Sequence, residues 1–153
     1  MKSIKSILNY SVTFVFIAGF VLILLNKQAV SDYIVLWNYE PAQEIVTLAN
    51  DSGMSDYSRK VFYVHNPGLL DSVQFNNSCK SIEETIVLGC FDGKRVYVFN
   101  VNNPKLSGIE EVTAAHEMLH AQYERLNENE KKRVNSLLDI QIAKLTDERI
   151  KNN

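Results

Sequence analysis

The strongest local structural signals in the chain lie between residues 85 and 126, TIVLGCFDGKRVYVFNVNNPKLSGIEEVTAAHEMLHAQYERL. Two runs in this stretch, residues 85–91 and 95–101, are rich in the β-branched and aromatic side chains that favour strands. The sequence Asp92-Gly93-Lys94 joins the two runs, and Asn102-Asn103-Pro104 follows the second one. A short connection that contains glycine is typical of antiparallel neighbours, so this stretch predicts a β-hairpin.

A helix is expected directly after the hairpin, over residues 108–126. Ser107 and Glu110 have the spacing of a capping box, in which each side chain accepts a hydrogen bond from the backbone N–H of the other residue. An apolar stripe at helical spacing is expected to bury this helix against the rest of the domain. The stripe consists of Val112, Leu119 and Tyr123. Asn127 and Glu130 then predict the start of a second helix, which is expected to run to residue 148.

The part of the chain before the hairpin predicts short elements. Residues 42–50 are expected to form a helix, because Pro41 is well placed at its first turn. Residues 60–65 are expected to form a strand that ends at the turn Asn66-Pro67-Gly68. Residues 71–84 are expected to be a loop. Separate helices and a short sheet together indicate a small α+β domain.

The most informative residues lie inside the first predicted C-terminal helix and read His116-Glu117-Met118-Leu119-His120. Positions i and i+4 share one helix face, so both imidazoles can bind one metal ion, while Glu117 stands beside them as a proton acceptor. With 3 His in 153 residues and the Glu content of the chain, chance would produce this pattern about 0.004 times. Chance is therefore a poor explanation for the motif.

The motif resembles that of the zincin metallopeptidases, and the resemblance covers residues 85–126. It implies that His116 and His120 are ligands of Zn²⁺ and that Glu117 is the general base. It also implies that the edge strand beside the helix aligns an extended peptide substrate, and residues 95–101 are expected to fill that role by strand addition.

The third zinc ligand is the point where the sequence departs from the family pattern. Tyr123 and Leu126 stand where the metzincin branch has Gly and His, so the resemblance is to the gluzincins, which use a carboxylate from a later helix. Glu148 and Asp139 are the first candidates for this ligand. Glu124 lies on the same helix, about 12 Å along the axis from His116. The carboxylates after the motif are Glu124, Glu128, Glu130, Asp139, Asp147 and Glu148.

Two other outcomes remain open for the third ligand. His65 would give a three-histidine centre, although a histidine in an exposed turn is the more common arrangement. Alternatively the ligand is absent and the chain is a shortened relative of the family, because two imidazoles alone bind zinc weakly.

The N-terminus predicts an association with a membrane. Residues 6–26 contain no charged side chain, and 21 residues form a helix of roughly 31 Å, which matches a hydrocarbon core of about 30 Å. Lys2 and Lys5 precede this run, so the N-terminus is expected in the cytoplasm and residues 28–153 outside it. Residues 1–27 are therefore predicted to be a single-pass anchor. A cleaved signal peptide, with Ala29-Val30-Ser31 as the cleavage site, would release a secreted domain instead.

Charge and cysteine content agree with export. Residues 28–153 have a formal net charge of −5 and no basic patch, which argues against nucleic acid as a partner. Cys79 and Cys90 are the only cysteines, and an oxidising compartment favours a disulfide between them. A metal-binding cysteine pair is the alternative. Trp37 is expected either in the aromatic belt of the membrane interface or packed on the domain.

The sequence as a whole predicts a membrane-anchored, extracytoplasmic zinc peptidase that acts on a peptide or protein. Two alternatives belong to other classes. One is a metal-free pseudo-peptidase that binds a peptide at the hairpin edge, and the other is a structural envelope protein in which the histidines merely pack.

Overall fold

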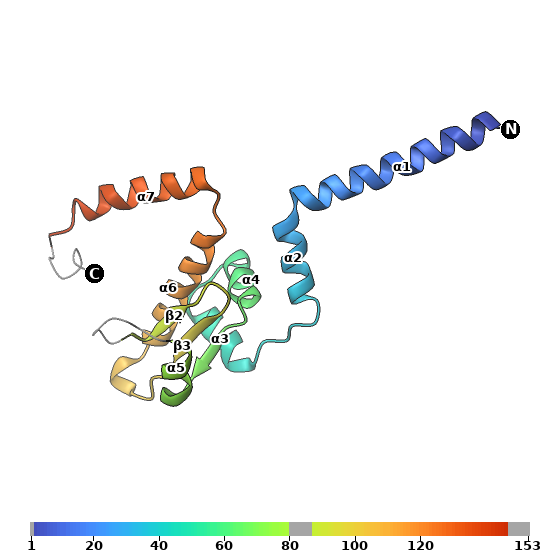
Figure 1. The fold of residues 1–153 in the computed structure, drawn as a ribbon. Helices are drawn as coiled ribbons and strands as arrows, with labels where there is room; N and C mark the ends of the chain where they lie inside the picture. The colour runs from blue at the N-terminus through green and yellow to red at the C-terminus, as the bar shows by residue number, and fades with distance from the viewer. Residues whose placement is uncertain (1, 80–86, 147–153) are drawn as a thin grey trace. The chain divides into compact units, whose positions relative to one another are not determined.

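The computed structural model describes residues 2–79 and 87–146, and this part of the chain is mainly helical with one small mixed sheet (Figure 1). An α+β architecture is thereby confirmed. The chain divides into two compact units, Met1–Glu40 and Pro41–Asn153.

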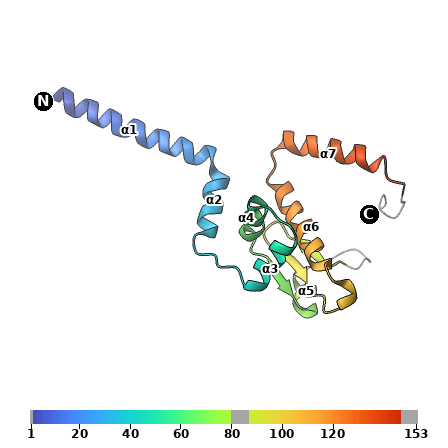
Figure 2. The same ribbon diagram turned by 180° about the vertical axis from the view of Figure 1, so that it is seen from behind.

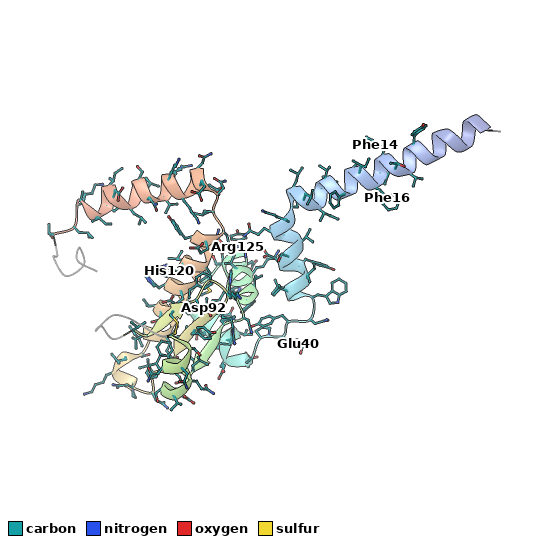
Figure 3. The ribbon with its side chains drawn as sticks, viewed as in Figure 1. Phe14, Phe16, Glu40, Asp92, His120 and Arg125 are labelled. Atoms are coloured by element: carbon teal, nitrogen blue, oxygen red, sulfur yellow. A yellow bond between two sulfur atoms is a disulfide. The ribbon has the colours of Figure 1, made fainter. Side chains whose placement is uncertain are left out.

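The first unit consists of two helices, α1 (Lys2–Leu25) and α2 (Lys27–Leu36). Asn26 separates them, and its side-chain amide donates to the carbonyl of Leu22 at 2.9 Å. In the described residues no single helix meets the length and hydropathy expected of a membrane span, whereas Tyr10–Leu25 and Lys27–Leu36 meet them as a pair bent by 81°. Phe14 and Phe16 project from α1 with about seven-tenths of their surface exposed (Figure 3). The N-terminal unit is thus an apolar, bent helix pair.

The sheet of the second unit has three strands in the order β1-β3-β2. Strands β2 (Gly89–Phe91) and β3 (Val96–Phe99) are antiparallel, with Cys90 opposite Tyr97, so the predicted hairpin is confirmed. Strand β1 (Gly68–Leu70) runs parallel to β3 and was not expected from the sequence. Because β3 has a neighbour on each side, β2 is an edge strand and β3 is not.

The strand expected over residues 60–65 is wrong, because residues 60–64 belong to helix α4 (Asp56–Val64) and His65 is the C-cap of that helix. The Ser55 hydroxyl accepts the backbone N–H of Ser58 and caps this helix at its start. Val61 and Phe62 are fully buried in the core. A short apolar run suits a buried strand and a buried helix equally well, so the cap and the tertiary packing decided this case.

The loop expected over residues 71–84 is also partly wrong. Ser72–Ser78 form helix α5, and the carboxylate of Asp71 caps it by accepting the N–H groups of Val73 and Gln74, each at 2.9 Å. Residues 80–86 lie outside the described part of the chain. Helix α5 contacts β3 and β1, and Phe75 meets the Phe99 ring edge to face at 5.6 Å.

Helix α3 (Gln43–Asp51) lies where the sequence predicts a helix, and it ends before Gly53, whose φ of +67° is the left-handed conformation that glycine tolerates. Helices α3 and α4 both pack against α6 (Ile109–Glu124), and α6 packs against β3 and β2. Both ribbon views show α6 alongside the sheet (Figures 1 and 2). The core lies between these elements and includes Ile45, Leu48, Phe62, Val96, Val98 and Met118.

The predicted helix over residues 108–126 is confirmed as α6, but its expected cap and buried face are wrong. Gly108, with φ +87°, occupies the N-cap position, and Glu110 accepts the backbone N–H of Val101 instead of closing a box with Ser107. A glycine in the left-handed conformation turns the chain into the helix directly after the short 3₁₀ turn Pro104–Leu106.

Two of the three residues of the apolar stripe expected to bury α6 face outward, and the third, Tyr123, is half-buried. Val112 and Leu119 are 66% and 60% exposed, whereas Ala114, Met118 and Ala121 are buried. The small alanine side chains let the helix backbone come close to the sheet, which the larger stripe residues would prevent.

Helix α7 (Glu128–Ile142) begins with the predicted capping box, in which Asn127 accepts the N–H of Glu130 and the Glu130 carboxylate accepts the N–H of Asn127. The helix ends at Ile142, earlier than the expected residue 148, and residues 147–153 lie outside the described part of the chain.

Candidate metal centre

Helix α6 places the two motif histidines one turn apart. The Nε2 atoms of His116 and His120 are 3.0 Å apart, and their ring centroids are 4.7 Å apart. Two imidazole nitrogens bound to one tetrahedral Zn²⁺ at about 2.0–2.1 Å would be roughly 3.3 Å apart. The two nitrogens are at hydrogen-bond distance, slightly closer than a shared ion requires, and His120 is labelled on α6 in Figure 3.

The lowered pKa of His120 favours metal binding. Burial lowers the pKa of His120 below its ordinary value, and the nearby His116 lowers it further because two imidazolium charges repel. Neutral imidazole is the form that donates a lone pair to a metal ion.

Glu117 lies between the helix and the edge strand, with 6% of its surface exposed. Burial raises the pKa of its carboxyl from 4.5 to about 7, because water can no longer stabilise the charged form. A carboxyl group that titrates near neutral pH is well matched to accept and return protons.

The three motif side chains line one cleft of about 470 Å³. Strand β2 contributes the facing wall through Gly89, Cys90 and Phe91. The zincin resemblance implied that residues 95–101 are the strand beside the substrate, but β3 is the central strand, and β2 is the edge strand that lines the cleft.

The backbone pairing shows which groups of β2 point away from the sheet. The carbonyl of Leu88 accepts the N–H of Phe99 at 2.8 Å, and the N–H of Asp92 donates to the carbonyl of Arg95 at 3.2 Å. Pairing groups alternate along an antiparallel strand, so the N–H and C=O groups of Gly89 and Phe91 point away from β3. This outer edge has the geometry needed to pair with an extended chain.

The side chain of Asp92 stabilises the hairpin turn beside the cleft. The Asp92 carboxylate accepts the N–H groups of Lys94 at 2.8 Å and Arg95 at 2.7 Å. Partial burial acts to raise the pKa of Asp92, but these hydrogen bonds, the Tyr97 hydroxyl and the Arg95 charge together lower it below the ordinary value. Asp92 is labelled in Figure 3.

His65 supports the same turn from α4 and does not join the motif histidines. Its Nδ1 lies 3.0 Å from the carbonyl oxygen of Lys94, which can only accept, so Nδ1 carries the proton. Its ring meets Phe91 edge to face at 5.0 Å. No local sequence pattern predicts this supporting role, because the contact joins segments that are 29 residues apart.

A second, apolar pocket of about 450 Å³ adjoins the histidine pair. Helix α6 contributes Leu119, Tyr123 and the two histidines, and α7 contributes Val134 and Leu138. The hydroxyl of Tyr123 donates to the Asn135 side chain at 2.9 Å and links the two helices.

The predicted third ligand is not found within residues 2–79 and 87–146, where no cluster of three His, Cys, Asp or Glu side chains could hold a metal ion. Asp139 is exposed on α7, and Glu124 lines the cleft but lies 3.7 Å from the Lys131 ammonium. Glu130 is engaged in the cap of α7. Glu148 and Asp147 lie outside the described residues.

Cys79 and Cys90 form a disulfide, the pairing that the sequence predicts. It joins the end of α5 to the edge strand β2, directly beside the cleft. A disulfide is typical of proteins that fold in an oxidising compartment, so it is consistent with an extracytoplasmic location.

Comparisons of the chain with protein-family models, with curated proteins and with solved structures found no match.

Proposed function

We propose that this protein is a membrane-anchored zinc peptidase whose catalytic unit, Pro41–Asn153, lies outside the cytoplasm. The observation that carries the proposal is the histidine pair, whose Nε2 atoms lie 3.0 Å apart in a cleft that Glu117 also lines. A structural role for these histidines would not require a buried carboxyl group beside them, whose charged form is costly away from water.

His116 and His120 fit a zinc ion as neutral nitrogen donors on one helix face. Zn²⁺ bound there would supply Lewis acidity to the substrate carbonyl and would lower the pKa of a water molecule to about 7. Glu117 accepts the proton of the attacking water at a carboxylate oxygen and then donates it to the leaving amine.

The substrate in this proposal is an extended peptide. Its backbone pairs with the outward N–H and C=O groups of Gly89 and Phe91, which places one of its carbonyls over the cleft. The apolar pocket formed by Leu119 and Leu138 beside the histidines can take a large apolar side chain of the peptide.

The proposed location rests on three features. The apolar N-terminal helix pair supports a membrane anchor, and Lys2 and Lys5 support a cytoplasmic N-terminus. The Cys79–Cys90 disulfide supports export of the second unit. Cleavage after the apolar segment would instead release the same unit as a secreted enzyme.

The decisive experiment is the zinc content of the full chain, purified in detergent without added metal. About one zinc per chain is expected, as for other catalytic zinc sites. His116→Ala and His120→Ala should lose the metal, whereas His65→Ala, which removes a histidine outside the pair, should retain it. A folded chain without zinc would overturn the peptidase proposal.

A metal-free peptide-binding protein is the second candidate, supported by the N–H and C=O groups of Gly89 and Phe91 that point away from β3. In this case the outer edge of β2 would still bind an extended peptide. Peptide binding by a zinc-free chain, measured by fluorescence anisotropy with a labelled peptide library, would support this candidate. A zinc-free chain that binds no peptide would leave a structural role for the histidines.

A further inference from the structure

Helix α2 carries an apolar stripe on one side. Val30, Tyr33, Ile34 and Trp37 follow the spacing i, i+3, i+4 and i+7, which places them along one helix face. Trp37 belongs to this face because its backbone is still helical, with φ −53° and ψ −40°. Tyr33, Ile34 and Trp37 remain 59%, 67% and 65% exposed. We call these four residues the α2 stripe.

The opposite side of α2 is mixed. Gln28 and Asp32 are four residues apart and lie roughly opposite the centre of the α2 stripe, at about 100° of rotation per residue, and Val35 lies on the same side. Asp32 is buried, with 7% of its surface exposed. The α2 stripe is therefore the exposed apolar side of the helix, and its large side chains are poorly suited to full immersion in water. An exposed stripe that carries tyrosine and tryptophan is typical of the boundary between lipid and water.

The geometry of the first unit agrees with such a boundary position. Helix α1 is apolar over Tyr10–Leu25, and α2 turns away from it by 81°. If α1 enters the bilayer along its normal, α2 lies almost parallel to the membrane surface. The two aromatic rings of the α2 stripe, Tyr33 and Trp37, meet edge to face with centroids 5.1 Å apart. Tyrosine and tryptophan are the residues enriched at this depth of a bilayer.

We propose that α2 is an interfacial helix, which binds the lipid headgroup region with the α2 stripe turned toward the acyl chains. The inference rests on the membrane insertion of α1 proposed above, and it is independent of the zinc site. The lipid surface is the preferred occupant because the stripe is continuous in sequence with the apolar helix that enters the same membrane.

Trp37 is the only tryptophan of the chain, so its fluorescence reports the depth of α2 without a label. The full chain is reconstituted into phosphatidylcholine vesicles that carry bromine either near the headgroups or near the bilayer centre. Bromine near the headgroups is expected to quench Trp37 more strongly, by about twofold or more. Acrylamide in the water is expected to quench it weakly.

Two neighbouring residues provide a matched pair of variants. Ile34→Asp places a charge in the α2 stripe and should reduce quenching by headgroup bromine by about twofold. Val35→Asp changes a similar side chain that lies about 100° away on the helix, and should leave the quenching unchanged. Equal effects of the two substitutions would contradict a stripe-specific contact.

The remaining outcomes overturn the inference in distinguishable ways. Stronger quenching by bromine at the bilayer centre would show that α2 is the second half of a bent span. Strong acrylamide quenching in a chain that resists carbonate extraction would show that α2 lies in water while the anchor holds. A chain that carbonate extracts would refute the anchor itself and this inference with it, but would leave the zinc proposal standing.

Discussion

Gly89 on the edge strand lies against Glu117 on α6, so closely that a methyl group at Gly89 would come within 2.8 Å of the Cγ atom and 3.0 Å of the Oε1 atom of Glu117. It would lie closer still to the methyl group of Thr113. The absence of a side chain at this position therefore lets the strand cover the carboxyl group. The resulting burial of the carboxyl group raises the pKa of Glu117.

The first prediction concerns this contact. Gly89→Ala should lower the free energy of unfolding by about 1–3 kcal/mol, because the strand must move away from the helix. It should also lower the pKa of Glu117, since water then reaches the carboxyl group. Urea denaturation measures the first effect. Gly68→Ala on β1 is the control, because its methyl group would meet only flexible side chains, Leu70 at 3.3 Å and Arg95 at 3.9 Å. Equal losses in the two variants would contradict the close approach.

The second prediction concerns catalysis. Glu117→Gln preserves the shape of the side chain and removes its ability to accept a proton. Peptide cleavage should fall by about a hundredfold or more, with the zinc content unchanged. Glu111→Gln, six residues earlier on α6 and outside the cleft, is the control and should keep its activity. Unchanged cleavage by Glu117→Gln would falsify the assignment of the general base.

The third prediction concerns the stability of the metal-free chain as a function of pH. The folded pKa of Glu117, about 7, exceeds the value of 4.5 expected without burial. Between these values the folded state holds a proton that the unfolded state has lost, so stability falls as the pH rises through this window. Above pH 7 the Glu117→Gln chain should be more stable than the parent by about 1–2 kcal/mol, because a neutral amide replaces a carboxylate that is buried with its charge. Below pH 4.5 the two chains should be similar. Chemical denaturation with chelator present provides the measurement, and a pH-independent difference would contradict it.

The fourth prediction concerns the hairpin turn. The folded pKa of Asp92 is lowered, so its charge stabilises the fold above the unfolded pKa and this contribution is lost as the pH falls through the folded value. Asp92→Asn keeps an oxygen that can accept the same N–H groups and removes only the charge. It should cost less than about 1 kcal/mol at neutral pH, because the group is largely exposed and water screens it. The difference from the parent should vanish at strongly acidic pH, as thermal denaturation across pH can test.

The fifth prediction concerns the disulfide. Reduction of Cys79–Cys90 should lower the free energy of unfolding by roughly 2–3 kcal/mol, because the bond closes a short loop and restricts the unfolded chain. A Cys79→Ser, Cys90→Ser double variant should match the reduced parent and should not respond to reductant. A parent chain whose stability is insensitive to reductant would count against this estimate.

Local sequence signals predicted several elements correctly. The hairpin followed from Asp92-Gly93-Lys94 between two β-rich runs, and the cap of α7 followed from Asn127 and Glu130. These features depend on residues a few positions apart, whose backbone hydrogen bonds form within one turn. The spacing of His116 and His120 on one helix face is of the same kind, because it depends only on the period of an α-helix.

Features that depend on contacts between distant segments were predicted wrongly from the sequence. Val61 and Phe62 suited a strand as well as a helix, and the capping by Ser55 and the packing of α4 against α6 decided for the helix. Val112 and Leu119 had helical spacing but face outward, because α6 buries its alanines instead. The periodicity of a helix shows that it has an apolar face, but the position of the sheet determines which face of the helix is buried.

The sequence by itself determined the hairpin, the main C-terminal helices, the histidine pair with Glu117 beside it, and the apolar N-terminus. Each is encoded within one local segment. Only the tertiary structure decided that β3 is the central strand and β2 an edge strand, that Gly89 lies against Glu117 and that His65 supports the hairpin turn. These contacts join segments brought together when the core excludes water, and spacing along the chain does not encode which surfaces then meet.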